Sequence, residues 1–341
     1  MQVTIKGAGI IGLSIGWRLL RDGFEVEIFD IGKAGRGASW AAAGMLSPYA
    51  EAHFEDDALV KMGEASLTLY PQFLKEVGED AETTITLESV GTLIVGIDKD
   101  DRAFLERLYQ EKQKRNFPIS WISPEEARKI EPLLTPRITT AIWLPTECQI
   151  DNRRLILALI KAFRNRGGIL HEESLMQSET GLVINARGAA ADPRIRPNKG
   201  QILTLFAPAS LRPAHVIRSP RVYLVPKTNG SVRVGATSEE KGSSEITAGA
   251  IRELLNAAVE IFPAVEEMSF QEAASAFRPL GLDRLPLIEE KGNTILASGH
   301  GRAGILLAPY TAETIVKLIG EKYGDSIQRA KRDCGSRNQL V

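Results

Sequence analysis

The strongest constraint on the fold of this chain is a glycine pattern close to its N-terminus. Gly7, Gly9 and Gly12 form a GxGxxG sequence. Alternating apolar residues at 3–5 and 26–28 predict strands on either side, and apolar residues at 11, 15 and 19 recur at helical spacing. Strand, helix and strand within about 30 residues predict a βαβ unit, whose two strands are parallel and buried.

The chemistry of this unit suits a dinucleotide. Glycines allow a tight turn and a close approach of the backbone to a pyrophosphate, while the helix N-terminus offers N–H groups and a positive dipole end. Asp30 ends the second strand and can accept hydrogen bonds from ribose hydroxyls. No basic residue follows Asp30 at once, so a 2′-phosphate is not expected. The alternative is a plain glycine-rich turn, which βαβ context and Asp30 together disfavour.

Composition excludes several other classes of protein. Forty-two basic and 43 acidic residues give a net charge of -1, so no global field attracts nucleic acid. The longest uncharged stretch, 37–50, contains Pro48 and is too short to span a bilayer, and the N-terminus has no export signal. Two distant cysteines favour a reducing compartment, and we expect a cytoplasmic protein. No histidine or cysteine spacing indicates a metal site.

A second small-residue segment carries a resemblance. Residues 35–46 read GRGASWAAAGML, and small side chains let backbone N–H groups approach phosphates and a flavin closely. This segment resembles the glycine oxidase branch (the thiamine biosynthesis type) of the D-amino-acid oxidase family of FAD-dependent oxidoreductases. Three further segments match the family in order: 149–155, 223–237, and 277–309 with its Gly299-His300-Gly301-Arg302-Ala303-Gly304 signature.

The resemblance implies an α/β fold and a division of the chain. A Rossmann-type FAD-binding domain (1–50, 146–195 and 287–330) is expected to interleave with a substrate domain (51–145 and 196–286) that contains a large, mostly antiparallel sheet. The final helix is expected over 312–323, and a polar, disordered tail over 331–341.

The resemblance also assigns residues. Arg278 and Arg302 would bind a substrate carboxylate, because a guanidinium can hold a carboxylate bidentately, and Tyr223 would place a hydroxyl near the substrate. The alternatives are structural salt bridges for the arginines and a core position for the tyrosine. The residues expected to bind FAD are Gly7, Gly9, Ile10, Ile11, Gly12, Asp30, Ile31, Ala38, Ser39, Ala42, Ala43, Gly44, Met45, Leu175, Gly188, His300, Gly301, Arg302, Ala303, Gly304, Ile305 and Leu306.

Some positions depart from the family pattern. The segment between residues 175 and 183, which is a longer β-meander in the family, is shortened here. The turn at 186–188 has Arg187 where the family has threonine. Gly301, Ala303 and Ser238 replace other residues at the substrate side. Fold and cofactor therefore transfer more safely than the substrate.

The implied reaction is oxidation of a small amino acid or amine, with glycine first, then sarcosine and small D-amino acids. The substrate becomes an imine, which hydrolyses to a keto acid and ammonia, while oxygen is reduced to hydrogen peroxide; glycine imine would also feed thiamine synthesis. Two alternatives stay open: a dehydrogenase of the same fold that passes electrons to a quinone or partner protein, and a non-catalytic FAD-bound subunit. A homo-oligomer is compatible with either.

Overall fold

The computed structural model describes residues 1–51, 57–175, 181–240 and 242–337, of which 323–337 are described as backbone alone. Its first sheet has six strands in the order β15-β16-β9-β1-β2-β8. All neighbouring pairs are parallel except the edge pair β15–β16. The strands are β1 (Gln2–Lys6), β2 (Glu25–Phe29), β8 (Ile169–His171), β9 (Leu182–Asn185), β15 (Leu287–Lys291) and β16 (Thr294–Ser298). Helix α1 (Ile10–Arg21) joins β1 to β2, which confirms the predicted βαβ unit.

Four helices bury the apolar surface around this sheet. Helix α1 lies against α8 (Ala308–Arg337) and α6 (Asn152–Asn165), and α3 (Asp57–Ala81) lies against α6 and α8. The apolar face of α3 includes Tyr70 and Val77, both fully buried in the core that also contains Ile5 and Ile28. Helix α3 thus belongs to the first core, although the expected boundaries assign 51–145 to the other domain.

The second sheet has eight strands in the order β14-β10-β13-β12-β11-β4-β6-β5. Every neighbouring pair is antiparallel except β11–β4. The strands are β4 (Thr92–Gly96), β5 (Ser120–Ile122), β6 (Thr140–Leu144), β10 (Arg196–Phe206), β11 (Val216–Arg218), β12 (Tyr223–Pro226), β13 (Ser231–Gly235) and β14 (Ser269–Leu280). The large, mostly antiparallel sheet expected for the substrate side is therefore present.

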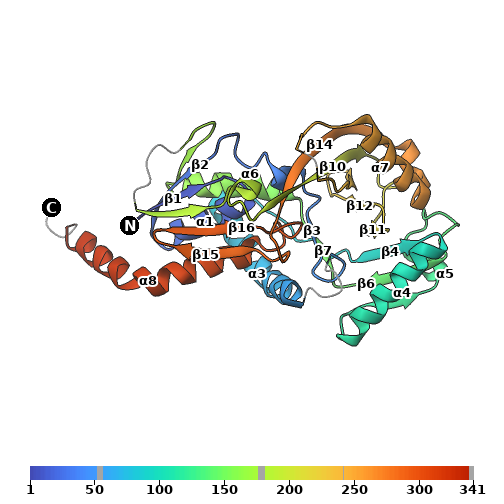
Figure 1. The fold of residues 1–341 in the computed structure, drawn as a ribbon, viewed down its shortest axis with the longest axis horizontal. Coiled ribbons are helices and arrows are strands. Elements are labelled where there is room, and N and C mark those ends of the chain that lie inside the picture. Colours follow the sequence, from blue (N-terminus) through green and yellow to red (C-terminus); the bar gives the residue numbers. More distant parts are fainter. Residues whose placement is uncertain (52–56, 176–180, 241, 338–341) are drawn as a thin grey trace.

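Helices and short elements complete this second lobe and the junction. Helix α7 (Ala248–Ile261) packs on β10 and β13, α4 (Lys99–Lys114) on β4 and β6, and α5 (Pro124–Ile130) on β6. Two 3₁₀ turns, Gly188–Ala190 and Pro263–Glu267, and the short helix α2 (Ala38–Ala41) are the remaining helical elements. Strands β3 (Met45–Leu46) and β7 (Cys148–Gln149) pair between the lobes. Figure 1 shows the first sheet with its helices on the left, and β10 and β14 running from the right-hand lobe back toward it.

The structure differs from the sequence-based expectations at the C-terminal helix and at strand β14. Helix α8 continues to Arg337, beyond the expected end at Tyr323, and its backbone includes 331–337, which were assigned to a tail; lysine, arginine and alanine between 328 and 337 have good helix propensity. Residues 338–341 lie outside the described residues. The edge strand β14 was not expected as a strand.

No helix of the described chain is long and apolar enough to cross a membrane. No group of three or more His, Cys, Asp or Glu that could hold a metal occurs among the described residues.

Candidate active site

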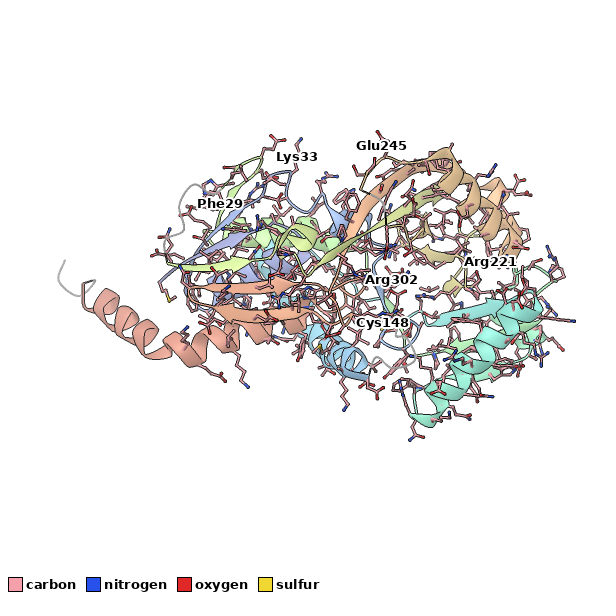
Figure 2. The ribbon with its side chains drawn as sticks, viewed as in Figure 1. Phe29, Lys33, Cys148, Arg221, Glu245 and Arg302 are labelled. Carbon is pink, nitrogen blue, oxygen red and sulfur yellow. The ribbon has the colours of Figure 1, made fainter. Side chains whose placement is uncertain are left out.

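One cavity of about 880 Å³ runs between the two sheets. At one end it is lined by the α1 N-terminus and by Asp30 and Lys33, and at the other by Tyr223, Arg278 and Arg302. Figure 2 shows Arg302 between the two lobes, while Phe29 and Lys33 lie toward the first sheet. The cavity therefore joins the predicted dinucleotide motif to the three predicted substrate-binding residues.

Most of the predicted cofactor residues line this cavity. The lining set is Gly7, Gly9, Ile10, Ile11, Asp30, Ile31, Ala38, Ser39, Ala42, Ala43, Gly44, Met45, Gly188, His300, Gly301, Arg302, Gly304 and Ile305. Four predicted residues are not in the lining: Gly12, Leu175, Ala303 and Leu306. Leu175 is 72% exposed at the edge of residues 176–180, which lie outside the described residues.

The three motif glycines have different structural tasks. Gly7 has φ +103°, and a Cβ there would lie 2.5 Å from the Ala186 carbonyl oxygen. A Cβ at Gly12 would lie 1.9 Å from the Gly7 oxygen, so Gly12 allows the helix to pack against the turn without lining the cavity. A Cβ at Gly9 would meet only the Ser39 Oγ, at 3.4 Å. Gly7 and Gly12 thus allow the turn to form, and Gly9 leaves the cavity free of a side chain at this point.

The N-terminus of α1 faces the cavity with its positive dipole end uncompensated. Gly9 is the N-cap and supplies no side chain, and the first turn has no acidic residue. The Ile10 N–H donates to Ser39 Oγ at 3.0 Å, while the N–H groups of Ile11 and Gly12 have no acceptor within the helix, whose first bond runs from the Leu13 N–H to the Gly9 carbonyl. Such an end stabilises an anion.

Asp30 has a second task beside the predicted one. Its Oδ2 accepts the Ala8 N–H at 2.7 Å, and its Oδ1 accepts the Gly32 N–H at 2.8 Å. The carboxylate therefore fixes the glycine turn and the loop after β2 to each other. It also lines the cavity, where each oxygen retains a lone pair for a ribose hydroxyl.

The small-residue loop is fastened by two residues that sequence analysis missed. A Cβ at Gly44, which has φ +77°, would lie 2.1 Å from the Ile150 carbonyl oxygen. The Asn152 amide donates to the Ser39 carbonyl at 2.7 Å, and Lys227 Nζ donates to the Ile150 carbonyl at 2.8 Å. Burial lowers the pKa of Lys227 to about 7.

Arg278 lies flat against the second sheet. Its Nη1 donates to Asn198 Oδ1 at 3.1 Å and to the Thr237 carbonyl at 3.0 Å, both neutral acceptors. A Cβ at Gly200 would lie 2.4 Å from Arg278 Nη2, so the absent side chain of this strand glycine makes the space for the guanidinium. Burial lowers the pKa of Arg278. Sequence analysis missed Gly200, although a glycine within a strand is a known sign of close approach.

Tyr223 is placed in the same way. It pairs with Gly235 of β13, where a Cβ would lie 2.6 Å from the Tyr223 hydroxyl. Burial raises the pKa of Tyr223, which keeps the phenol protonated. Arg302, on the loop after β16, is exposed to the cavity and forms no ion pair with the described residues.

Two further charged residues at this end were not predicted. Arg218, at the end of β11 and opposite Tyr223 in the sheet, donates from Nη1 to Glu51 Oε1. Burial opposes ionisation of Glu51, but Arg218, Arg302 and Arg278 together hold its pKa below the usual range. Burial also opposes ionisation of Arg218, and Glu51 raises its pKa above the usual value. The pair is therefore ionised and lies in the cavity wall.

His300 supports the signature loop rather than the chemistry. It is 2% exposed, and its Nε2 lies 2.9 Å from Thr311 Oγ1. Burial lowers its pKa to about 4, so the imidazole is neutral near pH 7. The residue lines the cavity, and within the described ranges no carboxylate is bonded to its ring to orient it as a general base.

The cavity fits FAD. The α1 N-terminus and the open backbone at Gly9 and Gly37, where a Cβ meets at most one hydroxyl, suit a pyrophosphate. Asp30 suits a ribose, and small side chains from Ala41 to Gly44 leave room for a flat ring system beside the second sheet. Its volume is also in the range of a large ligand site.

Comparisons with known proteins agree with this geometry. The family described as FAD dependent oxidoreductase (DAO) matches residues 2–318. Glycine oxidase from Geobacillus kaustophilus is 29% identical over 94% of this chain and 93% of its own length. The putative thiamine biosynthesis oxidoreductase ThiO of Rhizobium etli is 29% identical over 97% of this chain and all of its own.

The fold comparison gives the same result. The crystal structure of the Geobacillus kaustophilus glycine oxidase superposes with a TM-score of 0.86, at 28% identity and 94% coverage of both chains. Family match, fold and cavity together show that this chain belongs to the FAD dependent oxidoreductase (DAO) family and uses FAD as its cofactor.

Proposed function

We propose that this protein is an amino-acid oxidase that acts on glycine or another small amino acid. The observation that carries the proposal is the pair Arg278 and Arg302 in the wall of the FAD cavity, neither of which has an acidic partner bonded to it among the described residues. Two guanidiniums without a carboxylate partner are suited to a carboxylate brought by a substrate. The names of the Geobacillus and Rhizobium relatives support glycine as that substrate.

The protein's own residues bind and orient. Arg278 and Arg302 would hold the substrate carboxylate bidentately, which fixes the direction of the Cα–H bond. The Tyr223 hydroxyl, kept protonated by burial, would donate to the same carboxylate. The sheet face formed by β10, β12, β13 and β14 would cover the reacting end and exclude bulk water from it.

FAD, when bound, supplies the two-electron oxidation of the amine to an imine. Imine hydrolysis consumes one water and gives glyoxylate and ammonia from glycine, while one oxygen molecule takes the two electrons and two protons as hydrogen peroxide. A role of the glycine imine in thiamine synthesis is supported by the name of the Rhizobium relative. The scarcity of cysteine supports a cytoplasmic location.

The test is anaerobic mixing of the purified yellow holoprotein with glycine, sarcosine, D-alanine and methylamine. We expect glycine and close analogues to bleach the flavin absorbance, and methylamine, which has no carboxylate, to do so poorly. Air is then readmitted. Reoxidation of the flavin within seconds supports oxygen as the electron acceptor. Slow reoxidation would indicate that another molecule accepts the electrons. A protein that no amine bleaches would overturn the proposed function.

A further inference from the structure

The substrate end of the cavity contains a carboxylate as well as guanidiniums. Among the described residues that line the cavity, Asp30 and Glu51 are the acidic ones. Asp30 is bonded to two N–H groups at the dinucleotide end. Glu51 follows β3 and lies close enough to Arg218, Arg278 and Arg302 for all three to lower its pKa. A negative charge thus stands beside the two arginines that would bind a substrate carboxylate.

Glu51 is fixed by one of its oxygens, and the described part of the chain supplies no donor to the other. Oε1 accepts from Arg218 Nη1, while Oε2 accepts no hydrogen bond from the described residues. Arg218 in turn contacts Sδ of Met45 at 3.7 Å, and Met45 belongs to the small-residue segment 35–46. The side chains of Glu51 and Arg218 are 17% and 14% exposed, so the cavity wall and the rest of the fold hold the pair in place.

An amino acid in water near pH 7 is a zwitterion. A site that binds it must compensate an ammonium as well as a carboxylate, because a charge removed from water without a partner is costly. Arg278 and Arg302 supply positive charge without an acidic partner of their own. Glu51 Oε2 is the open anionic acceptor next to them.

We propose that Glu51, held by Arg218, binds the amino group of the substrate and makes the site selective for amino acids over other small carboxylic acids. The proposal rests on the proposed function, since it assigns the amino-group contact of that substrate. Arg218 is a positioning residue: it holds Oε1 of Glu51 in an ion pair and keeps the carboxylate ionised. Without this pairing, Glu51 would compete with the substrate carboxylate for the two arginines.

The other charged and titratable groups around Glu51 are compatible with this role. Glu147 is buried and accepts N–H bonds from Tyr49 and Ala50 and a hydroxyl bond from Thr92, and burial raises its pKa. These bonds engage both of its oxygens, and Glu147 is not among the residues that line the cavity. Tyr223 stays protonated and neutral. Glu51 therefore remains the anionic group that faces the substrate end.

The experiment compares glycine with glycolate, in which a hydroxyl replaces the ammonium, in the holoenzyme of the parent and of Glu51→Gln. The Kd for glycine is taken from the concentration dependence of anaerobic flavin reduction, and that for glycolate from the flavin absorbance shift at equilibrium. The readout is the ratio of the glycolate Kd to the glycine Kd. We expect this ratio to fall about 10-fold or more in Glu51→Gln, because a charge-assisted bond to glycine is lost. Glycolate itself should bind as well as before or more tightly, since a repelling charge is gone.

Controls keep the result specific. Glu289→Gln removes the charge of another arginine-paired glutamate, bonded to Arg194 outside the cavity, and should leave the ratio unchanged. The double variant Glu51→Gln/Arg218→Met avoids a buried arginine without its partner and should show the same fall in the ratio. A ratio that stays at the parent value in both Glu51 variants overturns the proposal. If glycine does not reduce the parent flavin, the proposed function fails separately, and equilibrium titration of glycine still gives the ratio.

Discussion

A methyl group at Gly200 should disable the proposed carboxylate-binding site by displacing Arg278. In Gly200→Ala the new Cβ would lie 2.4 Å from Arg278 Nη2 and 2.5 Å from Cζ, whereas ordinary contacts begin near 3.4 Å. The guanidinium must therefore rise from the sheet by about 1 Å, which also strains its bonds to Asn198 and Thr237. A displacement of about 1 Å at a positioning group costs about 100-fold in rate, or about 2.7 kcal/mol in the activation barrier.

The assay is kcat/KM for glycine, measured together with FAD content. We expect a loss of about 100-fold with FAD content near that of the parent. Arg278→Ala should lower kcat/KM by about 30- to 5,000-fold, because one partner of a desolvated charge pair is then missing. In the Arg278→Ala background, adding Gly200→Ala should cause no further loss, since no guanidinium remains to be displaced. Methylamine oxidation should change little in either variant, because methylamine has no carboxylate to bind.

A matched control separates this effect from a general effect of glycine replacement. Gly249, in α7, has nothing within 4 Å of its Cβ position, so Gly249→Ala should retain activity and gain about 0.5–1 kcal/mol in stability. Gly200→Ala with the kcat/KM of the parent, or with a loss that adds in full to that of Arg278→Ala, would refute the reasoning.

Three further changes test the dinucleotide end and the signature loop. Gly9→Ala should lower FAD content while the apoprotein keeps its stability, since only Ser39 Oγ is near the new Cβ. Gly7→Ala is strained by a φ of +103° and should lower the free energy of unfolding. Equal stabilities of the two apoproteins would contradict this reasoning. Asp30→Ala should weaken FAD binding about 10- to 150-fold and also destabilise the apoprotein, since two N–H groups lose their acceptor; unchanged FAD titration would count against the assignment. Because burial lowers the pKa of His300 to about 4, its unfolded form binds a proton first as pH falls. Its contribution to the free energy of unfolding should thus fall by up to about 3 kcal/mol as the pH falls from ~6.5 to ~4. In His300→Gln, the urea concentration at the unfolding midpoint should therefore depend less on pH over this range.

The dinucleotide end could be predicted from sequence because its requirements are local. A turn with φ +103° at Gly7, a helix start at Gly9 and an acceptor at Asp30 all follow from neighbours in the first βαβ unit. Such needs leave fixed spacings in the chain. The structure gathers most of the predicted residues at one cavity, and it adds that Gly12 serves helix packing instead.

The substrate end could be predicted only in part because its geometry comes from pairings between distant segments. Arg218 and Glu51 are 167 residues apart, and each reads in the sequence as an ordinary charged residue. Gly200 gave a signal as a strand glycine, but its purpose appears only when β14 places Arg278 over it. Strand β14 itself contains alanine, glutamate and glutamine, residues with weak strand propensity, and its pairing with β10 overrides that preference.

The charges around the cavity explain how a nearly neutral chain can bind anions at both ends. The chain as a whole has a net charge of -1, yet the described lining contains seven basic residues and two acidic ones. The basic residues are Lys33, Arg36, Arg187, Arg218, Arg221, Arg278 and Arg302. A local excess of positive charge between low-dielectric walls concentrates the field on the ligand, which here would be a pyrophosphate at one end and a carboxylate at the other. Asp30 and Glu51 are the two acidic residues within this field, and Glu51 is the one at the substrate end. A negative charge at that end would distinguish a site for a zwitterion from a site for a simple anion.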